Sequence, residues 1–190
     1  MIYQPSEDSY LLQKVLIGRL RMIGNKNLRI LEKQEGFKIL DMGTGSGIQA
    51  KACKEAGFDN NVVSDINPEV IANMKKLGFE AIESDLFSNI NEKFDLIIFN
   101  PPYLPEDERE PGESRLQTTG GKEGCEIIIR FLKRAVEHLS GGGRVLLLFS
   151  SLSNPNKILD VAKGSGYEYK LLDREKLDFE ELFVYEFWVR

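Results

Sequence analysis

Short apolar runs alternate with segments of helical periodicity along most of this 190-residue chain. Strands usually show such apolar runs, and amphipathic helices show the longer period, with Gly and Pro marking their ends. A helix between two strands usually joins them in parallel, with a right-handed crossover. We therefore expect an α/β fold, a mostly parallel sheet with helices on both faces. Strands are predicted over residues 37–42, 61–64, 79–83, 94–99 and 144–150, and helices over residues 6–23, 48–56, 69–77, 123–139 and 155–163.

The end of the chain follows a different pattern. Two further predicted strands, residues 167–173 and 182–189, have no helix between them, which favours an antiparallel pair. A long polar loop is expected from Leu104 to Lys122. No shift in composition marks a boundary, and the length suffices for one sizeable core, so residues 1–190 are predicted to form a single domain.

Composition excludes several function classes. The net charge of -5 and the isoelectric point near 5.1 argue against a large nucleic-acid surface, which usually needs a basic face. Cys53 and Cys125 lack metal-ligand spacing and His138 is the only histidine, so no protein-bound metal is expected. Two cysteines are typical of a reducing compartment, and no signal peptide or membrane-length apolar run is present. These features favour a cytoplasmic protein without a membrane segment.

A glycine-rich turn follows the first predicted strand, where Gly43, Gly45 and Gly47 allow close approach of a ligand to the backbone. A dinucleotide-binding turn would need Gly or Ala at the position of Ile48. Asp41 precedes the glycines, and its carboxylate suits a cationic group better than a pyrophosphate. S-adenosylmethionine, which carries an amino group and a sulfonium but no phosphate, fits this turn. The alternative is a turn with only a packing role.

Further polar residues follow the next strands. Asp65 lies at the separation from the glycine turn at which an acid reaches ribose hydroxyls, although it could instead cap the next helix. Asp85 could accept a hydrogen bond from an adenine amine while the Leu86 N–H reaches a ring nitrogen, although Asp85 could also be a solvated loop acid. With Asn100, these residues end four successive strands, where open α/β sheets bind ligands.

The segment Asn100-Pro101-Pro102-Tyr103 emerges from a buried strand. Prolines fix φ and lack an N–H, so the Asn100 side chain and the Pro101 carbonyl form a rigid pair of acceptors beside an aromatic ring. Such a pair suits a planar NH2 group. A proline-rich turn that merely closes the strand is the alternative.

At these residues the chain resembles the HemK-type class I methyltransferases, and most closely their short archaeal and eukaryotic branch. The resemblance runs from the N-terminus to the C-terminus, and the opening segment is its most branch-specific part. The motifs that carry it are Tyr3-Gln4-Pro5-Ser6-Glu7-Asp8-Ser9, Asp41-Met42-Gly43-Thr44-Gly45-Ser46-Gly47, Asp65-Ile66-Asn67-Pro68-Glu69, Ser84-Asp85-Leu86-Phe87, Asn100-Pro101-Pro102-Tyr103 and Gly120-Gly121-Lys122-Glu123-Gly124.

The resemblance implies a Rossmann-like seven-stranded sheet of order 3-2-1-4-5-7-6, with strand 7 antiparallel. It implies S-adenosylmethionine as cofactor and a catalytic role for Asn100, Pro101 and Tyr103. Pro102 joins these three in the implied substrate site. The implied cofactor-binding residues are Ser9, Asp41, Gly43, Gly45, Asp65, Asp85, Leu86 and Asn100.

The resemblance also implies partners. The substrate would be the GGQ glutamine of a class 1 release factor, and a small zinc-containing activator would add a strand at the edge of Phe79–Glu83. An ordinary exposed edge is the alternative reading of that strand. The long acidic loop after Tyr103 is expected either to cover the substrate or to be a solvated loop. The competing functions are an adenine-N6 or guanine-N2 methyltransferase on DNA or RNA, and a non-catalytic cofactor-binding module.

Overall fold

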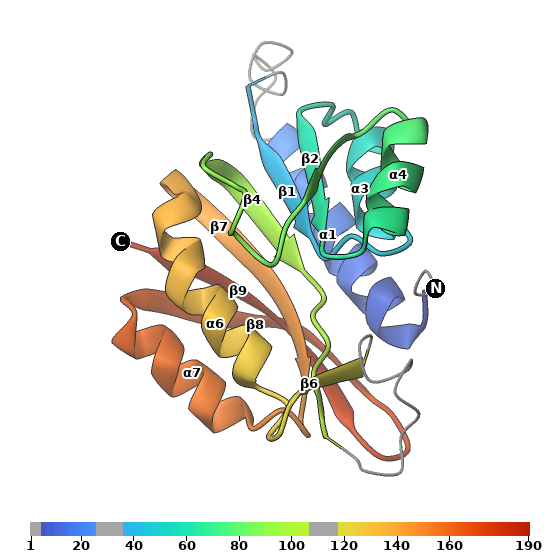
Figure 1. Cartoon of the computed structure of the whole chain (residues 1–190). Coiled ribbons are helices and arrows are strands. Elements are labelled where there is room, and N and C mark those ends of the chain that lie inside the picture. Colours follow the sequence, from blue (N-terminus) through green and yellow to red (C-terminus); the bar gives the residue numbers. More distant parts are fainter. Residues whose placement is uncertain (1–4, 26–35, 107–117) are drawn as a thin grey trace.

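The computed structural model describes residues 5–25, 36–106 and 118–190 (Figure 1). The first two predicted motif residues, Tyr3 and Gln4, lie outside this part, as do residues 107–117 of the acidic loop. The elements, in chain order, are α1 (Glu7–Asn25), β1 (Ile39–Met42), α3 (Ile48–Glu55), β2 (Asn61–Asp65), α4 (Pro68–Lys76), β3 (Glu80–Glu83), β4 (Phe94–Phe99), β5 (Leu104–Pro105), β6 (Thr119–Gly121), α6 (Glu126–Ala135), the 3-10 helix η1 (Val136–His138), β7 (Leu139–Ser150), α7 (Pro155–Gly164), β8 (Tyr167–Lys176) and β9 (Glu181–Val189).

Seven strands form one sheet in the order β3-β2-β1-β4-β7-β9-β8. Numbered within this sheet, the order is 3-2-1-4-5-7-6, as the family resemblance implied. The first five strands of this order pair in parallel, and β9 runs antiparallel to both β7 and β8. The predicted fold class and the predicted antiparallel pair at the end of the chain are therefore confirmed.

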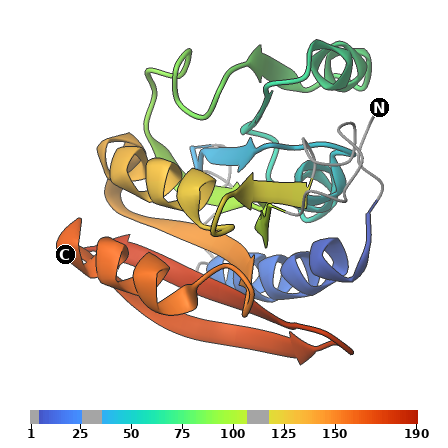
Figure 2. The same cartoon turned by 60° about the horizontal axis from the view of Figure 1, so that its bottom comes forward.

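The core lies on both faces of this sheet because side chains alternate along each strand. In β4, Ile97 joins one apolar cluster with Phe131 of α6, while Ile98 joins a second cluster with Leu16 of α1. Figures 1 and 2 show α6 and α1 on opposite sides of the sheet. Strands buried on both faces read as continuous apolar runs, which explains why they were recognisable in the sequence.

Two details of the prediction are wrong. The predicted helix over residues 123–139 begins only at Glu126, whose carboxylate accepts hydrogen bonds from the N–H groups of Glu123 and Cys125 and so holds the turn before α6. It ends before Leu139, which pairs with Phe94 as the first residue of β7. The predicted loop over residues 104–122 contains β5 and β6, which form a small parallel pair. Within the described residues, no helix has the length and apolar content needed to cross a bilayer.

Candidate functional site

The carboxyl ends of the parallel strands bring the predicted polar residues to one edge of the sheet. Asp41 lies in β1, Asp65 is the last residue of β2, and Asn100 directly follows β4. Asp85 follows β3 after one intervening residue. These strands are adjacent in the sheet and run in the same direction, so their ends share an edge (Figure 1).

The glycine turn after β1 is left-handed at three positions, with φ of 60° at Gly43, 51° at Gly45 and 76° at Gly47. Other residues rarely adopt this conformation. A Cβ on Gly43 would lie 3.3 Å from the Phe99 ring, and one on Gly47 would lie 2.7 Å from the end of Met74. The turn thus presents bare backbone, as a ligand cradle requires.

Asp41 is almost fully buried behind this turn, at 2% exposure. Its Oδ2 accepts hydrogen bonds from Thr44 Oγ1 at 2.7 Å and from the Ala50 N–H at 3.1 Å. Burial raises the pKa of Asp41 to about 7, against the opposing effect of these two hydrogen bonds. An added positive charge nearby would therefore strongly favour the ionised form, so the position suits a cationic ligand group.

Asp65 ties the glycine turn to the end of β2. Its Oδ2 accepts from the Gly45 N–H at 3.0 Å, and its Oδ1 accepts from the Asn67 N–H at 2.9 Å. The helix-capping role considered for Asp65 belongs instead to Asn67, whose side chain accepts from the Glu69 N–H. These hydrogen bonds hold the Asp65 carboxylate beside the glycine turn, next to where a ligand bound at that turn would lie.

The end of β3 presents a backbone N–H rather than a side chain. Asp85 is turned outward and forms an ion pair with Arg130 of α6 at 2.7 Å, with both side chains half exposed or more. Leu86 is left-handed with φ of 49°, a conformation that costs about 1–3 kcal/mol for a residue other than glycine. Ser84 Oγ holds it by donating to the Leu86 carbonyl at 2.7 Å. No described residue accepts a hydrogen bond from the Leu86 N–H.

The Asn100 amide has one satisfied and one unsatisfied end. Its Nδ2 donates to Asp8 Oδ2 at 3.1 Å. Its Oδ1 is buried and has no hydrogen-bond partner among the described residues. No described residue donates to the Pro101 carbonyl either. An unsatisfied buried acceptor costs about 1–3 kcal/mol, so Oδ1 is a candidate for contact with a bound donor.

The backbone after Asn100 is fixed from several sides. Ser153 Oγ donates to the Tyr103 carbonyl at 2.8 Å, and the Tyr103 N–H donates to the Thr118 carbonyl at 3.1 Å. Gly120 packs so closely that a Cβ there would lie 2.7 Å from the Pro102 carbonyl oxygen. The half-buried Tyr103 ring packs against both core clusters. These contacts hold the backbone after Asn100 in place.

Sequence reasoning missed two side chains in this region. Asp8 was quoted only within the opening motif, without a role of its own, and Ser153 was not singled out. Both act through partners far away along the chain, Asn100 and Tyr103, and local patterns carry no signal for such contacts. Ser9, a predicted cofactor ligand, is buried beside Asp8, and its hydroxyl donates to that carboxylate. In the described residues, no three His, Cys, Asp or Glu side chains are grouped as metal ligands.

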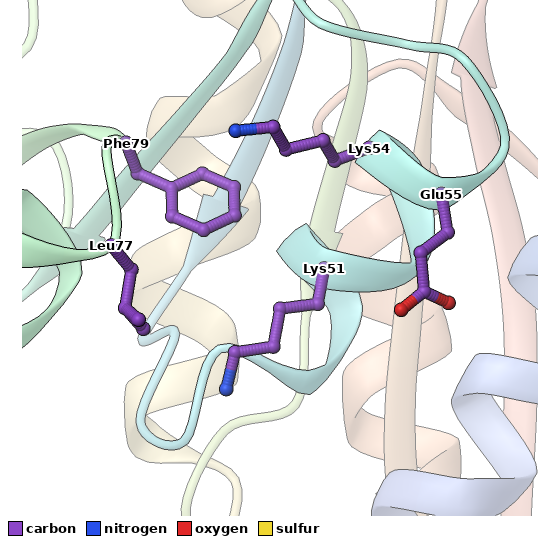
Figure 3. A pocket seen from close by; sticks show the side chains of 5 residues that line it. All are labelled: Lys51, Lys54, Glu55, Leu77 and Phe79. Carbon is purple, nitrogen blue, oxygen red and sulfur yellow. The ribbon is translucent and has the colours of Figure 1, made fainter.

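A hollow lies between α3 and the start of β3 (Figure 3). No predicted site residue lines it. Figure 3 shows Lys51 and Lys54 extending from α3 toward Leu77 and Phe79, and Glu55 completes the lining. The Lys54 ammonium lies 5.3 Å from the centre of the Phe79 ring, which is a cation–π contact. The hollow therefore adjoins the edge strand, and Lys51, which lines it, also donates to the Ser46 carbonyl of the glycine turn at 2.8 Å.

Comparisons with known proteins agree with this geometry. The family model described as the methyltransferase small domain matches residues 24–170. A Methanocaldococcus jannaschii protein, described as a candidate protein N5-glutamine methyltransferase, is 36% identical over 195 residues, which cover 98% of this chain and 91% of that protein. Human methyltransferase HEMK2 is 27% identical over 181 residues, which cover 88% of this chain and 80% of that protein.

A solved structure extends the comparison to three dimensions. The E. cuniculi Mtq2-Trm112 complex, described as responsible for methylation of the eRF1 translation termination factor, has a chain that superposes with a TM-score of 0.72 at 25% identity. The match covers all of this chain and 99% of that chain. These relatives confirm the resemblance to HemK-type enzymes. The matched family model covers most of the chain, and the chain belongs to the methyltransferase small domain family.

Proposed function

We propose that this enzyme transfers a methyl group to the side-chain amide nitrogen of the GGQ glutamine in a class 1 release factor. One observation carries the proposal: the buried Oδ1 of Asn100 has no partner in the described residues and lies in a rigid segment next to the Pro101 carbonyl. Two fixed acceptors match the two N–H groups of a primary amide. The similarity to a described N5-glutamine methyltransferase supports the same acceptor.

The proposed cofactor is S-adenosylmethionine, which when bound supplies an electrophilic methyl group on a sulfonium. The bare glycine turn and the buried carboxylate of Asp41 fit a cationic amino acid moiety, and Asp65 fits ribose hydroxyls. The Leu86 N–H has no described acceptor and fits a ring nitrogen, as the sequence predicted. The residues proposed to hold the cofactor are Ser9, Asp41, Gly43, Gly45, Asp65, Leu86 and Asn100. Asp85, the remaining predicted ligand, would have to leave its ion pair with Arg130 to join them.

The difficult part of the reaction is the nucleophile, because an amide nitrogen shares its lone pair with its carbonyl. Hydrogen bonds from the amide to Asn100 Oδ1 and the Pro101 carbonyl would aim the nitrogen and stabilise the positive charge that develops on it. The Tyr103 ring would stack on the amide plane. Orientation of this kind contributes up to roughly 7–11 kcal/mol in ideal cases. The proton leaves after methyl transfer, so the scheme assigns no side chain as a general base.

A nucleobase amine would satisfy the same two acceptors. Adenine-N6 or guanine-N2 methylation of DNA or RNA is therefore the second candidate. The net charge of -5 favours the protein acceptor, because nucleic-acid binding draws on Lys and Arg contacts to phosphate.

The deciding experiment is methyl transfer from labelled S-adenosylmethionine to a release factor, its GGQ→GGA variant, DNA and RNA, with and without the small zinc-containing activator. We expect label in the release factor, none in the GGA variant, and none with Asn100→Ala enzyme. Label in nucleic acid but not in protein would replace the first proposal by the second. No label in any acceptor, from enzyme that binds the cofactor, would favour a non-catalytic binding module.

We also propose that a small zinc-containing partner adds a strand to the sheet at β3. This strand ends the sheet and pairs only with β2 among the described strands. The neighbouring Leu77 is 44% exposed, and Phe79 lines the adjacent hollow (Figure 3). The E. cuniculi complex contains a second protein, Trm112. Leu77→Glu should weaken co-purification with the partner while the unfolding midpoint of the free enzyme stays within error; unchanged co-purification would argue for an ordinary edge.

The two larger of the three core clusters lie on opposite faces of one sheet, which supports our proposal that residues 1–190 form a single methyltransferase domain. A release-factor substrate also supports a cytoplasmic site of action. Cys53 and Cys125 are buried free thiols, as a reducing compartment allows.

A further inference from the structure

Asp8, at the start of α1, contacts the side-chain amide of Asn100, which directly follows β4. Its carboxylate is 4% exposed. The Asn100 Nδ2 donates to Asp8 Oδ2 at 3.1 Å, and this bond joins residues 92 positions apart. A buried carboxylate at a helix N-terminus is well placed, because the helix dipole favours negative charge there.

The other carboxylate oxygen fixes Asp8 itself. Asp8 Oδ1 accepts hydrogen bonds from Ser6 Oγ at 2.8 Å, from the Ser9 N–H at 2.5 Å and from Ser9 Oγ at 3.2 Å. The Ser9 carbonyl in turn accepts from Gln49 Nε2 of α3 at 2.9 Å. The donors at Oδ1 therefore orient the carboxylate so that its Oδ2 meets the Asn100 amide.

A primary amide can turn over at little steric cost, because its NH2 and its oxygen have nearly the same size. The two orientations differ in chemistry: one presents an acceptor to the substrate and the other presents a donor. An ionised carboxylate only accepts hydrogen bonds, so contact with Asp8 selects the orientation with Nδ2 toward Asp8 and Oδ1 away from it.

We propose that Asp8 is a positioning residue that keeps the Asn100 oxygen, and not its NH2 group, facing the acceptor nitrogen. The inference rests on the proposed function in one respect: the substrate must offer N–H groups to Asn100. It is independent of whether these belong to a glutamine or to a nucleobase. Without this contact, the turned-over amide would place its own N–H groups against those of the substrate.

Asp8→Asn is the sharpest variant, because it keeps the size of the side chain and replaces one oxygen by a donor. The oxygen that remains stays with the Ser9 N–H, so the new NH2 group faces Asn100, and the Asn100 amide turns its own oxygen toward it. We expect kcat to fall on the order of 100-fold while the Kd for S-adenosylmethionine changes little. Glu7→Gln, at the exposed neighbouring position, removes the same charge and should keep full kcat.

Asp8→Ala separates positioning from packing. It leaves the Asn100 amide free to adopt either orientation, so kcat should fall less than in Asp8→Asn. A purely structural role predicts the opposite order, because Asn is the milder change in shape. In an Asn100→Ala background, Asp8→Asn should cause no further loss of kcat, since it acts through that amide. Additive losses, or an Asp8→Ala defect larger than that of Asp8→Asn, would overturn the proposal.

A measurement without substrate completes the test. In 15N-edited NMR spectra of the full chain, the Asn100 side-chain NH2 signals should shift in Asp8→Asn and remain in place in Glu7→Gln. Unchanged Asn100 signals in Asp8→Asn would also overturn the positioning role. If no acceptor takes up label, the proposed function fails, while these amide spectra still decide whether Asp8 sets the orientation of Asn100.

Discussion

Asp41→Asn should make the free energy of unfolding less dependent on pH. The wild-type carboxyl is buried behind the glycine turn at 2% exposure, and burial raises its pKa from 3.8 to about 7. The folded chain therefore holds this proton more tightly than the unfolded chain does. A raised folded-state pKa contributes stability that is fully present below the unfolded pKa and is lost as the pH rises through the folded pKa. Asparagine is uncharged throughout and keeps an oxygen for the Ala50 N–H.

The size of the effect follows from the two pKa values of Asp41. At about 1.4 kcal/mol per pH unit, the difference between 3.8 and about 7 corresponds to about 4 kcal/mol over the whole titration. Between about pH 5 and about pH 8, the part that titrates is about 2–3 kcal/mol. Relative to wild type, the free energy of unfolding of Asp41→Asn should therefore increase by about 2–3 kcal/mol between about pH 5 and about pH 8.

Urea unfolding of both proteins at several pH values in this interval measures the difference directly, and effects of other titrating groups common to both largely cancel. Asp178→Asn, at an exposed hairpin position, controls for the loss of one negative charge. A wild-type-to-variant difference that stays constant with pH would refute the reasoning. It would mean that Asp41 ionises in the folded chain as readily as in the unfolded chain.

The remaining predictions concern the site directly. Asn100→Ala should lower kcat on the order of 100-fold with a small change in cofactor Kd, measured by methyl transfer and calorimetry; near-normal turnover would contradict the mechanism. Asp65→Ala should weaken cofactor binding about 10- to 100-fold by calorimetry, since hydrogen bonds to a charged group contribute about 1.5–3 kcal/mol; an unchanged Kd would remove Asp65 from the cofactor site. Gly120→Ala should lower both kcat and the unfolding midpoint, because its Cβ would lie 2.7 Å from the Pro102 carbonyl oxygen. Gly141→Ala, with no atom within 4 Å of the added Cβ, should change neither.

The sheet was predictable because parallel strands buried on both faces are apolar throughout, and because helices between them force the crossovers. The predicted boundaries of α6 were wrong at both ends, because contacts made by individual residues determine where the helix starts and stops. Glu126 accepts from N–H groups that precede it, so α6 starts later than its apolar period suggested. The sequence favoured a helix that ends at Leu139. Leu139 instead begins β7, because it pairs with Phe94 of β4, 45 residues earlier in the chain.

The strand-end residues were predictable for the same topological reason, but their orientations were not. Asp65 and Asn100 follow their strands, as expected, and share one edge. Asp85 follows its strand too, yet pairs outward with Arg130, which the sequence does not reveal. The contact between Asp8 and Asn100 is likewise set by how α1 packs on the sheet, and no spacing in the sequence encodes it.

Three features of the strand-end edge are unfavourable for the folded chain alone: the buried acceptor of Asn100, the left-handed Leu86 and the desolvated carboxylate of Asp41. Such features persist only where the surrounding structure holds them in place. Here the surroundings are one large apolar cluster on each face of the sheet and a set of long-range hydrogen bonds. These include the bonds from Ser153 to Tyr103 and from Asn100 to Asp8. Among the described residues, Asn100 Oδ1 has no donor, the Leu86 N–H has no acceptor and Asp41 has no cationic partner. A different part of one ligand pair would therefore stabilise each of them. An amide substrate together with an adenosyl sulfonium cofactor supplies all three.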